Sequence, residues 1–423
     1  TSTHGYKVNF CKFTNETRCG MEEASEQSGL SFIAACNGTA SGGGYELALA
    51  CNSIYLIDDG NAAVSLPEVP LLAVLPGTGG LTRLVDKRMV RRDLADIFCT
   101  KAEGFRTRDA KKYGLIDGGF PRSKWDEGIA RVAAEAAAAS PARQQQGITL
   151  HNVEPTVSEG ALEYTHVHVA LDHEGRKADI TIKAPTTPAP ASYDELLAQG
   201  DQTWGMWMYK ELEDALLRLR FNHPALGLLV FRTEGDPAAV LAHDQALHQH
   251  AGQWFADELI WYRGRVLRRV DNMSKSMFAL IDEGSCWVGT LFEITMACDR
   301  SYMLEDDDGE VAITLNQASA GLYPMVTRMS RLECRFAGTP DQVGTVLEEQ
   351  GRAIDGPDAF DLGLVTMALD DIDWEDEVRI AIEERVSLSP DALTGMEQNL
   401  RFVGKENCDT KIYGRLTAWQ NWI

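Results

Sequence analysis

Hydrophobic and polar residues alternate in two neighbouring segments of the chain, 164–172 and 178–184. Side chains of a strand point alternately to opposite faces, so this period of two predicts two half-buried strands. The residues between them, His173 to Lys177, suit a turn, and together the segments predict a β-hairpin. A proline-rich connection, 183–192, follows the second strand.

The first third of the chain holds apolar runs of other lengths. The runs 31–36 and 53–57 are short and predict buried strands. The alanine-rich segment 123–140 predicts a long helix, with Ser123 as its N-cap. Another helix is expected at 107–113. Because strands and helices mix along the chain, the predicted fold class is α/β.

The chain also contains an internal repeat. Residues 32–56 align with residues 278–303, which places Glu46 on Glu293 at an offset of 247. Matches that continue as far as Ser140 keep an offset of 249. Since only small insertions interrupt this register, we predict two copies of one domain in tandem.

The domain boundaries follow from the repeat. We predict a first copy at 1–146, a linker at 147–162 and a second copy at 163–423. If the copies are equal in length, the first copy lacks roughly its first 87 residues. The chain is therefore expected to be an N-terminal truncation, and its first residue is Thr rather than Met.

Composition restricts the class of partner. The formal net charge is −23, and such a chain repels nucleic acid and anionic membrane surfaces. No apolar run approaches the roughly 20 residues that span a bilayer. Nine cysteines without a C-x-x-C spacing indicate small core residues in a reducing compartment, so we expect a cytoplasmic protein without a zinc site.

One basic cluster stands out in this acidic chain. Its interpretation is a solvated helix face, with phosphate binding as the alternative. The cluster consists of Arg83, Lys87, Arg88, Arg91 and Arg92.

Three consecutive glycines, Gly42, Gly43 and Gly44, precede a predicted helix. Glycine lets a backbone approach a ligand closely, and the first amides of a helix have no partner within it. The segment could bind a carbonyl oxygen that gains negative charge. A tight turn without a ligand is the simpler alternative, and neither G-x-G-x-x-G nor a Walker lysine supports a nucleotide loop.

Two carboxylates lie near these glycines in the sequence. Glu46 falls in the first helical turn, where interaction with the helix dipole alone would explain it. Glu68 follows an apolar strand and points either to solvent or into a pocket. Together they could form a general acid/base pair that activates water. His166 and His168 share a strand face, but a third ligand is not evident, and no metal site is expected.

These residues resemble the two signatures of the enoyl-CoA hydratase (crotonase) superfamily. The first signature covers Phe32–Ala48, and the second covers Ser65–Gly80. The resemblance implies a crotonase fold, an acyl-CoA substrate and no metal or redox cofactor. It also implies that the Gly43 amide donates to the thioester oxygen, that a second donor lies upstream of residue 1, and that Glu46 and Glu68 are the acid/base carboxylates. Crotonase-type proteins usually associate, so a homo-oligomer is expected.

The second copy departs from this pattern, because Gln317 replaces the counterpart of Glu68 and no glycine triplet precedes Glu293. It is expected to have lost its own catalysis. Further segments, among them Lys7–Arg18, resemble a ring-opening branch of the superfamily, which implies hydrolysis of an oxidised benzoyl-CoA with release of formate. The alternatives are an ordinary enoyl-CoA hydratase or isomerase and a non-catalytic scaffold.

Overall fold

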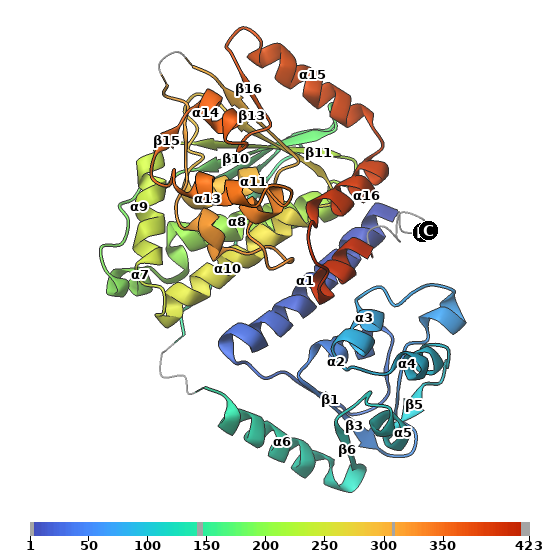
Figure 1. Cartoon of the computed structure of the whole chain (residues 1–423). Helices are drawn as coiled ribbons and strands as arrows, with labels where there is room; N and C mark the ends of the chain where they lie inside the picture. Colours follow the sequence, from blue (N-terminus) through green and yellow to red (C-terminus); the bar gives the residue numbers. More distant parts are fainter. Residues whose placement is uncertain (1–3, 142–146, 307–308, 416–423) are drawn as a thin grey trace. The chain divides into compact units, whose positions relative to one another are not determined.

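The computed structural model describes residues 4–141, 147–306 and 309–415. The chain divides into two compact units (Figure 1). Of the described residues, the smaller unit holds 10–141 and 406–415, and the larger holds 4–9, 147–306 and 309–405. The segment 406–415 therefore packs with the first copy, although its sequence position follows the second.

The smaller unit holds two three-stranded sheets. In one, β3 pairs in parallel with β1 and with β6. In the other, β4 pairs in parallel with β2 and antiparallel with β5. The strands are β1 (Ile33–Cys36), β2 (Ala40–Ser41), β3 (Ser53–Asp58), β4 (Ala63–Ser65), β5 (Phe105–Arg106) and β6 (Gly118–Pro121).

Helices cover these sheets around a core that includes the fully buried Tyr45, Leu49, Ile54 and Phe98. A π-helical turn follows β4 and begins at Glu68. The helices are α1 (His4–Ser28), α2 (Gly43–Ala50), α3 (Gly80–Asp86), α4 (Arg92–Cys99), α5 (Thr107–Lys112), α6 (Trp125–Ala139) and α17 (Cys408–Thr410). From Phe10 onward, α1 belongs to this unit.

The predicted cap of one helix in the smaller unit is wrong. The long helix predicted at 123–140 is present as α6, but Ser123 is not its N-cap, because a 3-10 turn at Arg122–Lys124 precedes the helix and Lys124 occupies the cap position. The first turn of α6 instead carries Asp126 and Glu127, which favour the positive end of the helix dipole.

The larger unit is built on an eight-stranded sheet with the order β16-β13-β12-β11-β10-β9-β8-β7. The predicted hairpin is confirmed, since β9 and β10 pair antiparallel with Val169 opposite Ile180. Both strands bury every second side chain. The strands are β7 (Thr156–Val157), β8 (Ala161–Glu163), β9 (Val167–Asp172), β10 (Lys177–Lys183), β11 (Leu228–Glu234), β12 (Ser276–Ile281), β13 (Arg300–Leu304), β14 (Ile313–Thr314), β15 (Ala353–Ile354) and β16 (Met367–Leu369).

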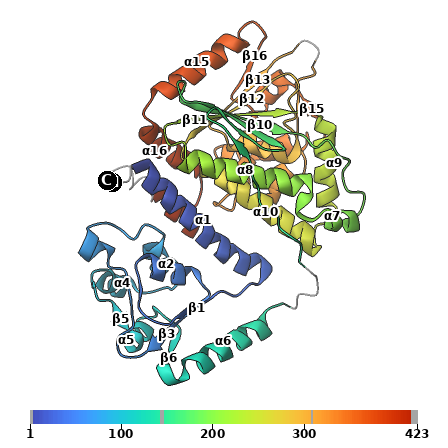
Figure 2. The ribbon, with the colours of Figure 1, turned by 180° about the vertical axis from the view of Figure 1, so that it is seen from behind.

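Helices cover both faces of this sheet, so that β12 is buried along its whole length. The main core lies between the sheet and α8 and α10, and a smaller core lies under α15 (Figures 1 and 2). None of the helices in the described ranges is both long and apolar enough to cross a membrane. The helices are α7 (Tyr193–Gln199), α8 (Trp204–Phe221), α9 (Pro237–His248), α10 (Trp254–Asp271), α11 (Phe292–Ala297), α12 (Arg331–Arg335), α13 (Asp341–Leu347), α14 (Gly356–Asp361), α15 (Trp374–Ser387) and α16 (Pro390–Arg401).

Strand pairings recur between the units at the offsets found in the sequence. In the smaller unit Ser41 pairs in parallel with Ser65, and in the larger unit Val288 pairs in parallel with Thr314. The antiparallel pair of β4 with β5 likewise has a counterpart in the pair of β14 with β15. These repeated pairings support the internal duplication.

Candidate functional site

The site in the smaller unit is built around the N-terminus of α2. Gly42 caps this helix with φ +55° and ψ −129°, a conformation open to glycine but not to other residues. Its amide donates to the carbonyl of Ser65 at 2.9 Å. A Cβ atom at Gly42 would lie 2.7 Å from Oε1 of Glu68. Gly42 therefore fixes the position of α2 and allows the Glu68 carboxylate to lie against the helix start.

Gly43 and Gly44 are the first residues of α2, and both are exposed. A Cβ atom built at either would meet no atom within 4 Å. The amides in the first turn of a helix have no partner within the helix and carry its positive partial charge. This end of α2 can therefore receive an anionic or polarised oxygen from outside the protein.

Glu46 lies one turn further into α2 and is buried. Its Oε1 accepts hydrogen bonds from the amides of Thr78 and Gly80, each at 2.9 Å. The Thr78 hydroxyl donates to Oε2. Gly80 has no room for a side chain, because a Cβ atom there would lie 2.9 Å from the Glu46 side chain. Glu46 thus holds the loop before α3 against α2.

Glu68 has a different environment. It is half-buried, and in the described part of the chain its Oε2 is buried without a hydrogen-bond partner. Burial raises the pKa of Glu68, and the nearby negative charge of Glu46 adds to this effect. A carboxyl group with a raised pKa can hold a proton and release it, as a general acid or base does. The structure therefore brings Glu46, Glu68 and Gly42–Gly44 together at one end of α2.

Sequence patterns did not predict α1, which forms one wall of this site. Its residues at spacings of three or four contact α2, α3 and the loop between them. Asn15 donates to the carbonyl of Gly77 at 3.4 Å, and Arg18 donates to the carbonyl of Gly43 at 2.9 Å. The spacing of Asn15, Arg18 and Glu22 was the available signal, but polar residues at helical spacing usually indicate a solvated face.

The prediction of a solvated basic face is wrong for Arg83, which is completely buried. Its guanidinium pairs with Glu22 at 2.9 Å and donates to the carbonyl of Thr78 at 3.0 Å. Burial opposes the charge of Arg83, but the pair with Glu22 outweighs it and raises the pKa of Arg83. Lys87 also pairs with Glu22, at 2.7 Å. Only Arg91 and Arg92 of the cluster are exposed.

The larger unit repeats the backbone turn of the site, but the amide equivalent to that of Gly43 is occupied by a side chain of the protein. Gly289, with φ +52°, occupies the position of Gly42. The next amide, that of Thr290, donates to Oδ2 of Asp244 at 2.7 Å. Asp244 is fully buried and pairs with Arg263 at 2.8 Å. The amide equivalent to that of Gly43 therefore already binds a carboxylate of the protein itself.

The retained carboxylate of the larger unit is also engaged. Glu293 pairs with Arg331 at 3.0 Å, and burial raises the pKa of Glu293. Gln317, the counterpart of Glu68, lines a separate pocket of about 480 Å³ between α9 and the segment after β14.

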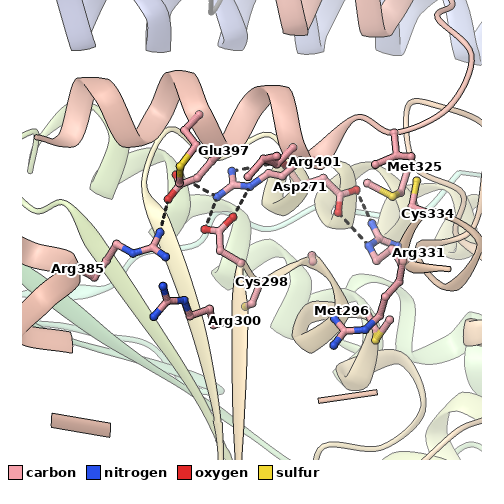
Figure 3. A pocket seen from close by; sticks show the side chains of 16 residues that line it. Asp271, Met296, Cys298, Arg300, Met325, Arg331, Cys334, Arg385, Glu397 and Arg401 are labelled. Carbon is pink, nitrogen blue, oxygen red and sulfur yellow. Dashed lines mark hydrogen bonds and ion pairs between the residues drawn. The ribbon is translucent and has the colours of Figure 1, made fainter. Parts of the chain in front are cut away.

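A second pocket of the larger unit, of about 400 Å³, contains a network of buried ion pairs (Figure 3). Arg401 pairs with Asp299 at 2.7 Å and with Glu397 at 3.5 Å. Arg385 pairs with the same Glu397 at 2.8 Å. This network ties α15 and α16 to the start of β13, so we assign it a structural role.

The two histidines near the hairpin differ in their surroundings. His168 contacts Glu163 at 2.8 Å, and burial lowers the pKa of His166. In residues 4–141, 147–306 and 309–415, no group of three or more His, Cys, Asp and Glu side chains could hold a metal ion.

Comparisons with known proteins show which chains this one resembles. The family model of enoyl-CoA hydratase/isomerase matches residues 14–170. A benzoyl-CoA-dihydrodiol lyase from Aromatoleum evansii is 50% identical over 423 residues, which is 100% of this chain and 76% of the relative. A 2,3-dehydroadipyl-CoA hydratase from Escherichia coli is 34% identical over 30% of this chain and 48% of its own. The crystal structure of an enoyl-CoA hydratase from Bacillus halodurans is 14% identical and covers 61% of this chain and 92% of its own, with a TM-score of 0.40.

Proposed function

The chain belongs to the benzoyl-CoA-dihydrodiol lyase family of the crotonase superfamily, and we propose that it opens the oxidised ring of a benzoyl-CoA derivative by hydrolysis. The substrate is 2,3-epoxybenzoyl-CoA or the corresponding dihydrodiol. One ring carbon leaves as formate, and the product is 3,4-dehydroadipyl-CoA semialdehyde. The observation that carries the proposal is the placement of two carboxylates, Glu46 and Glu68, beside the open N-terminus of α2.

In this mechanism the Gly43 amide polarises the thioester carbonyl, which then accepts negative charge while the carbon–carbon bond breaks. The reaction consumes two water molecules from the epoxide, or one from the dihydrodiol, and these supply the oxygen that the products gain. Glu68, whose pKa is raised by burial, holds and transfers a proton. Glu46 orients the loop of Thr78 and shares a hydrogen bond with its hydroxyl. Because hydrolysis needs only water and acid/base groups, the proposal includes no metal and no redox cofactor.

The proposal also includes the cellular compartment, the partners and the oligomeric state of the enzyme. We place it in the cytoplasm, a reducing compartment, because all nine of its cysteines are free thiols in the described residues. The substrate is an acyl-CoA, and neither nucleic acid nor a membrane is a partner of this acidic chain. A homo-oligomer is proposed by analogy with the superfamily.

The deciding experiment is a measurement of formate. The complete gene product is supplied with 2,3-epoxybenzoyl-CoA or its dihydrodiol, with crotonyl-CoA as a parallel substrate. Formate in proportion to the substrate consumed is the expected result. Hydration of crotonyl-CoA without formate would replace the proposal with an ordinary hydratase, and no reaction with either substrate would favour a scaffold.

The residue assignment has its own test. Glu46→Gln and Glu68→Gln should each reduce formate release strongly while the protein stays folded. Near-normal turnover in both variants would contradict the assignment of these two carboxylates.

A further inference from the structure

Arg18 on α1 is a buried cation whose hydrogen-bonding capacity is only partly used. Its side chain is 8% exposed. Nη2 donates to the carbonyl of Gly43 at 2.9 Å. Nε and Nη1 are buried and have no hydrogen-bond partner among the residues that the structure describes. Buried polar groups are normally paired, so two open donors on one guanidinium require an explanation.

Glu46, whose negative charge acts on Arg18, does not supply the hydrogen-bond acceptors that Arg18 lacks. Burial lowers the pKa of Arg18, and the negative charge of Glu46 opposes this effect. Both oxygens of Glu46, however, already accept from Thr78 or Gly80. The charge of Arg18 is therefore felt by the site, but its Nε and Nη1 are left without an acceptor within the described chain.

Arg83 of the same unit shows what a structural arginine looks like here. It is also buried, but Nε and Nη2 bond to Glu22 and Nη1 bonds to the carbonyl of Thr78. Each nitrogen of the Arg83 guanidinium thus donates a hydrogen bond to a partner within the protein. The contrast distinguishes Arg18 from Arg83, although both lie beside the loop that Glu46 holds.

We propose that Arg18 binds an oxygen of the acyl group of the substrate, and binds it most strongly when that oxygen gains negative charge. The inference rests on the proposed function. Arg18 bonds to the carbonyl of Gly43, the residue whose amide receives the thioester oxygen in that mechanism. A guanidinium presents several donors in a fixed plane and stays charged, so it suits an oxygen whose charge develops during the reaction.

This role has a kinetic signature. An interaction that is stronger in the transition state than in the bound substrate raises kcat, whereas equal binding of both states changes KM. Because Arg18 carries a charge that a neutral thioester does not satisfy, its removal should reduce kcat more than it raises KM.

The experiment compares three variants of the complete gene product in the formate assay. Arg18→Met removes the charge and keeps most of the side-chain length, and we expect kcat to fall on the order of 10²-fold, as for loss of an oxyanion donor. Arg18→Lys keeps the charge but not the planar donors and should lose less. Arg88→Gln is the matched control, because Arg88 bonds to Gly114 and Asp117 away from the site. It should keep the kcat of the wild type per folded molecule.

Chemical rescue separates a substrate contact from a role in packing. Guanidinium chloride at a non-denaturing concentration should restore part of the kcat of Arg18→Met, whereas sodium chloride at equal ionic strength should not. An unchanged kcat in Arg18→Met, or a lowered kcat without rescue in a destabilised protein, would overturn the inference. If Arg18→Met does not fold, Arg18→Lys decides the question. A normal kcat in Arg18→Lys that guanidinium does not change would overturn the inference, whereas a lowered kcat in Arg18→Lys would support it. Formate release by the wild type tests the proposed function separately.

Discussion

Glu46 and Glu68 should respond in opposite ways to removal of their carboxylates. Glu46 is bonded on both oxygens and holds the loop before α3, whereas Glu68 has an oxygen that is buried without a partner in the described chain. The first carboxylate contributes to the fold and the second opposes it. We therefore predict that Glu46→Ala destabilises the smaller unit and that Glu68→Gln does not.

The magnitude for Glu46 follows from the groups left behind. Glu46→Ala leaves the buried amides of Thr78 and Gly80 without an acceptor. A stranded buried donor costs roughly 1–3 kcal/mol, so the variant should lose on the order of 2–6 kcal/mol. Glu46→Gln keeps one carbonyl oxygen for both amides and should lose about 1 kcal/mol.

The raised pKa of Glu68 predicts that the stability of the folded protein depends on pH. Its pKa in the folded protein is raised, so the folded state binds its proton more tightly than the unfolded chain does. Its contribution to stability is therefore fully present below the unfolded pKa and is lost as the pH rises through the folded pKa. Glu68→Gln removes this dependence, and above that window it should be at least as stable as the wild type.

Hydrogen exchange of the amides of α2 and of residues 78–83, measured with increasing urea, reports on the smaller unit. Protection should fall in Glu46→Ala and be kept in Glu68→Gln, while formate release falls in Glu68→Gln. Wild-type protection in Glu46→Ala would refute the reasoning about stranded amides. A large loss of protection in Glu68→Gln would refute the claim that this carboxylate does not stabilise the fold.

Two further predictions concern the larger unit. Since Asp244 already occupies the amide of Thr290, the protein should bind one benzoyl-CoA per chain in calorimetric titration, and two per chain would contradict the closed site. Arg401→Met leaves Asp299 as a buried charge without its partner and should cost about 3–5 kcal/mol in unfolding experiments. The exposed Arg379→Met is its control and should unfold like the wild type, and equal stability of both variants would show that the buried network is not stabilising.

Much of the architecture could be predicted because periodicity and turn chemistry are local. The hairpin of β9 and β10, the strand at Ile33–Cys36 and the helix α6 follow from such patterns. The glycine run at the start of α2 is also visible in the sequence, and the positive φ of Gly42 explains why glycine stands there. The resemblance to the crotonase signatures then predicted Glu46 and Glu68 as the acid/base carboxylates.

The rest of the site depends on contacts between segments far apart in the sequence. Arg18 meets Gly43 across 25 residues, and Glu22 meets Arg83 across 61. A basic cluster on a helix usually faces solvent, and no local feature of Arg83 shows that Glu22 will cover it. In the same way, the sequence of the second copy shows that it lacks the glycine triplet but not that Asp244 accepts a hydrogen bond from the amide of Thr290.

A comparison of the two copies distinguishes the position of Glu46 from that of Glu68. Glu46 and its counterpart Glu293 are both buried; Glu46 is bonded to the loop of Thr78, and Glu293 pairs with Arg331 through Oε2 while its Oε1 has no hydrogen-bond partner among the described residues. Glu68, by contrast, has Gln317 as its counterpart. In the larger unit, where the Thr290 amide already binds Asp244, the carboxylate at the position of Glu46 is retained and the one at the position of Glu68 is replaced by an amide. Under the proposed function we therefore predict that replacement of Glu68 reduces turnover more, per folded molecule, than Glu46→Gln.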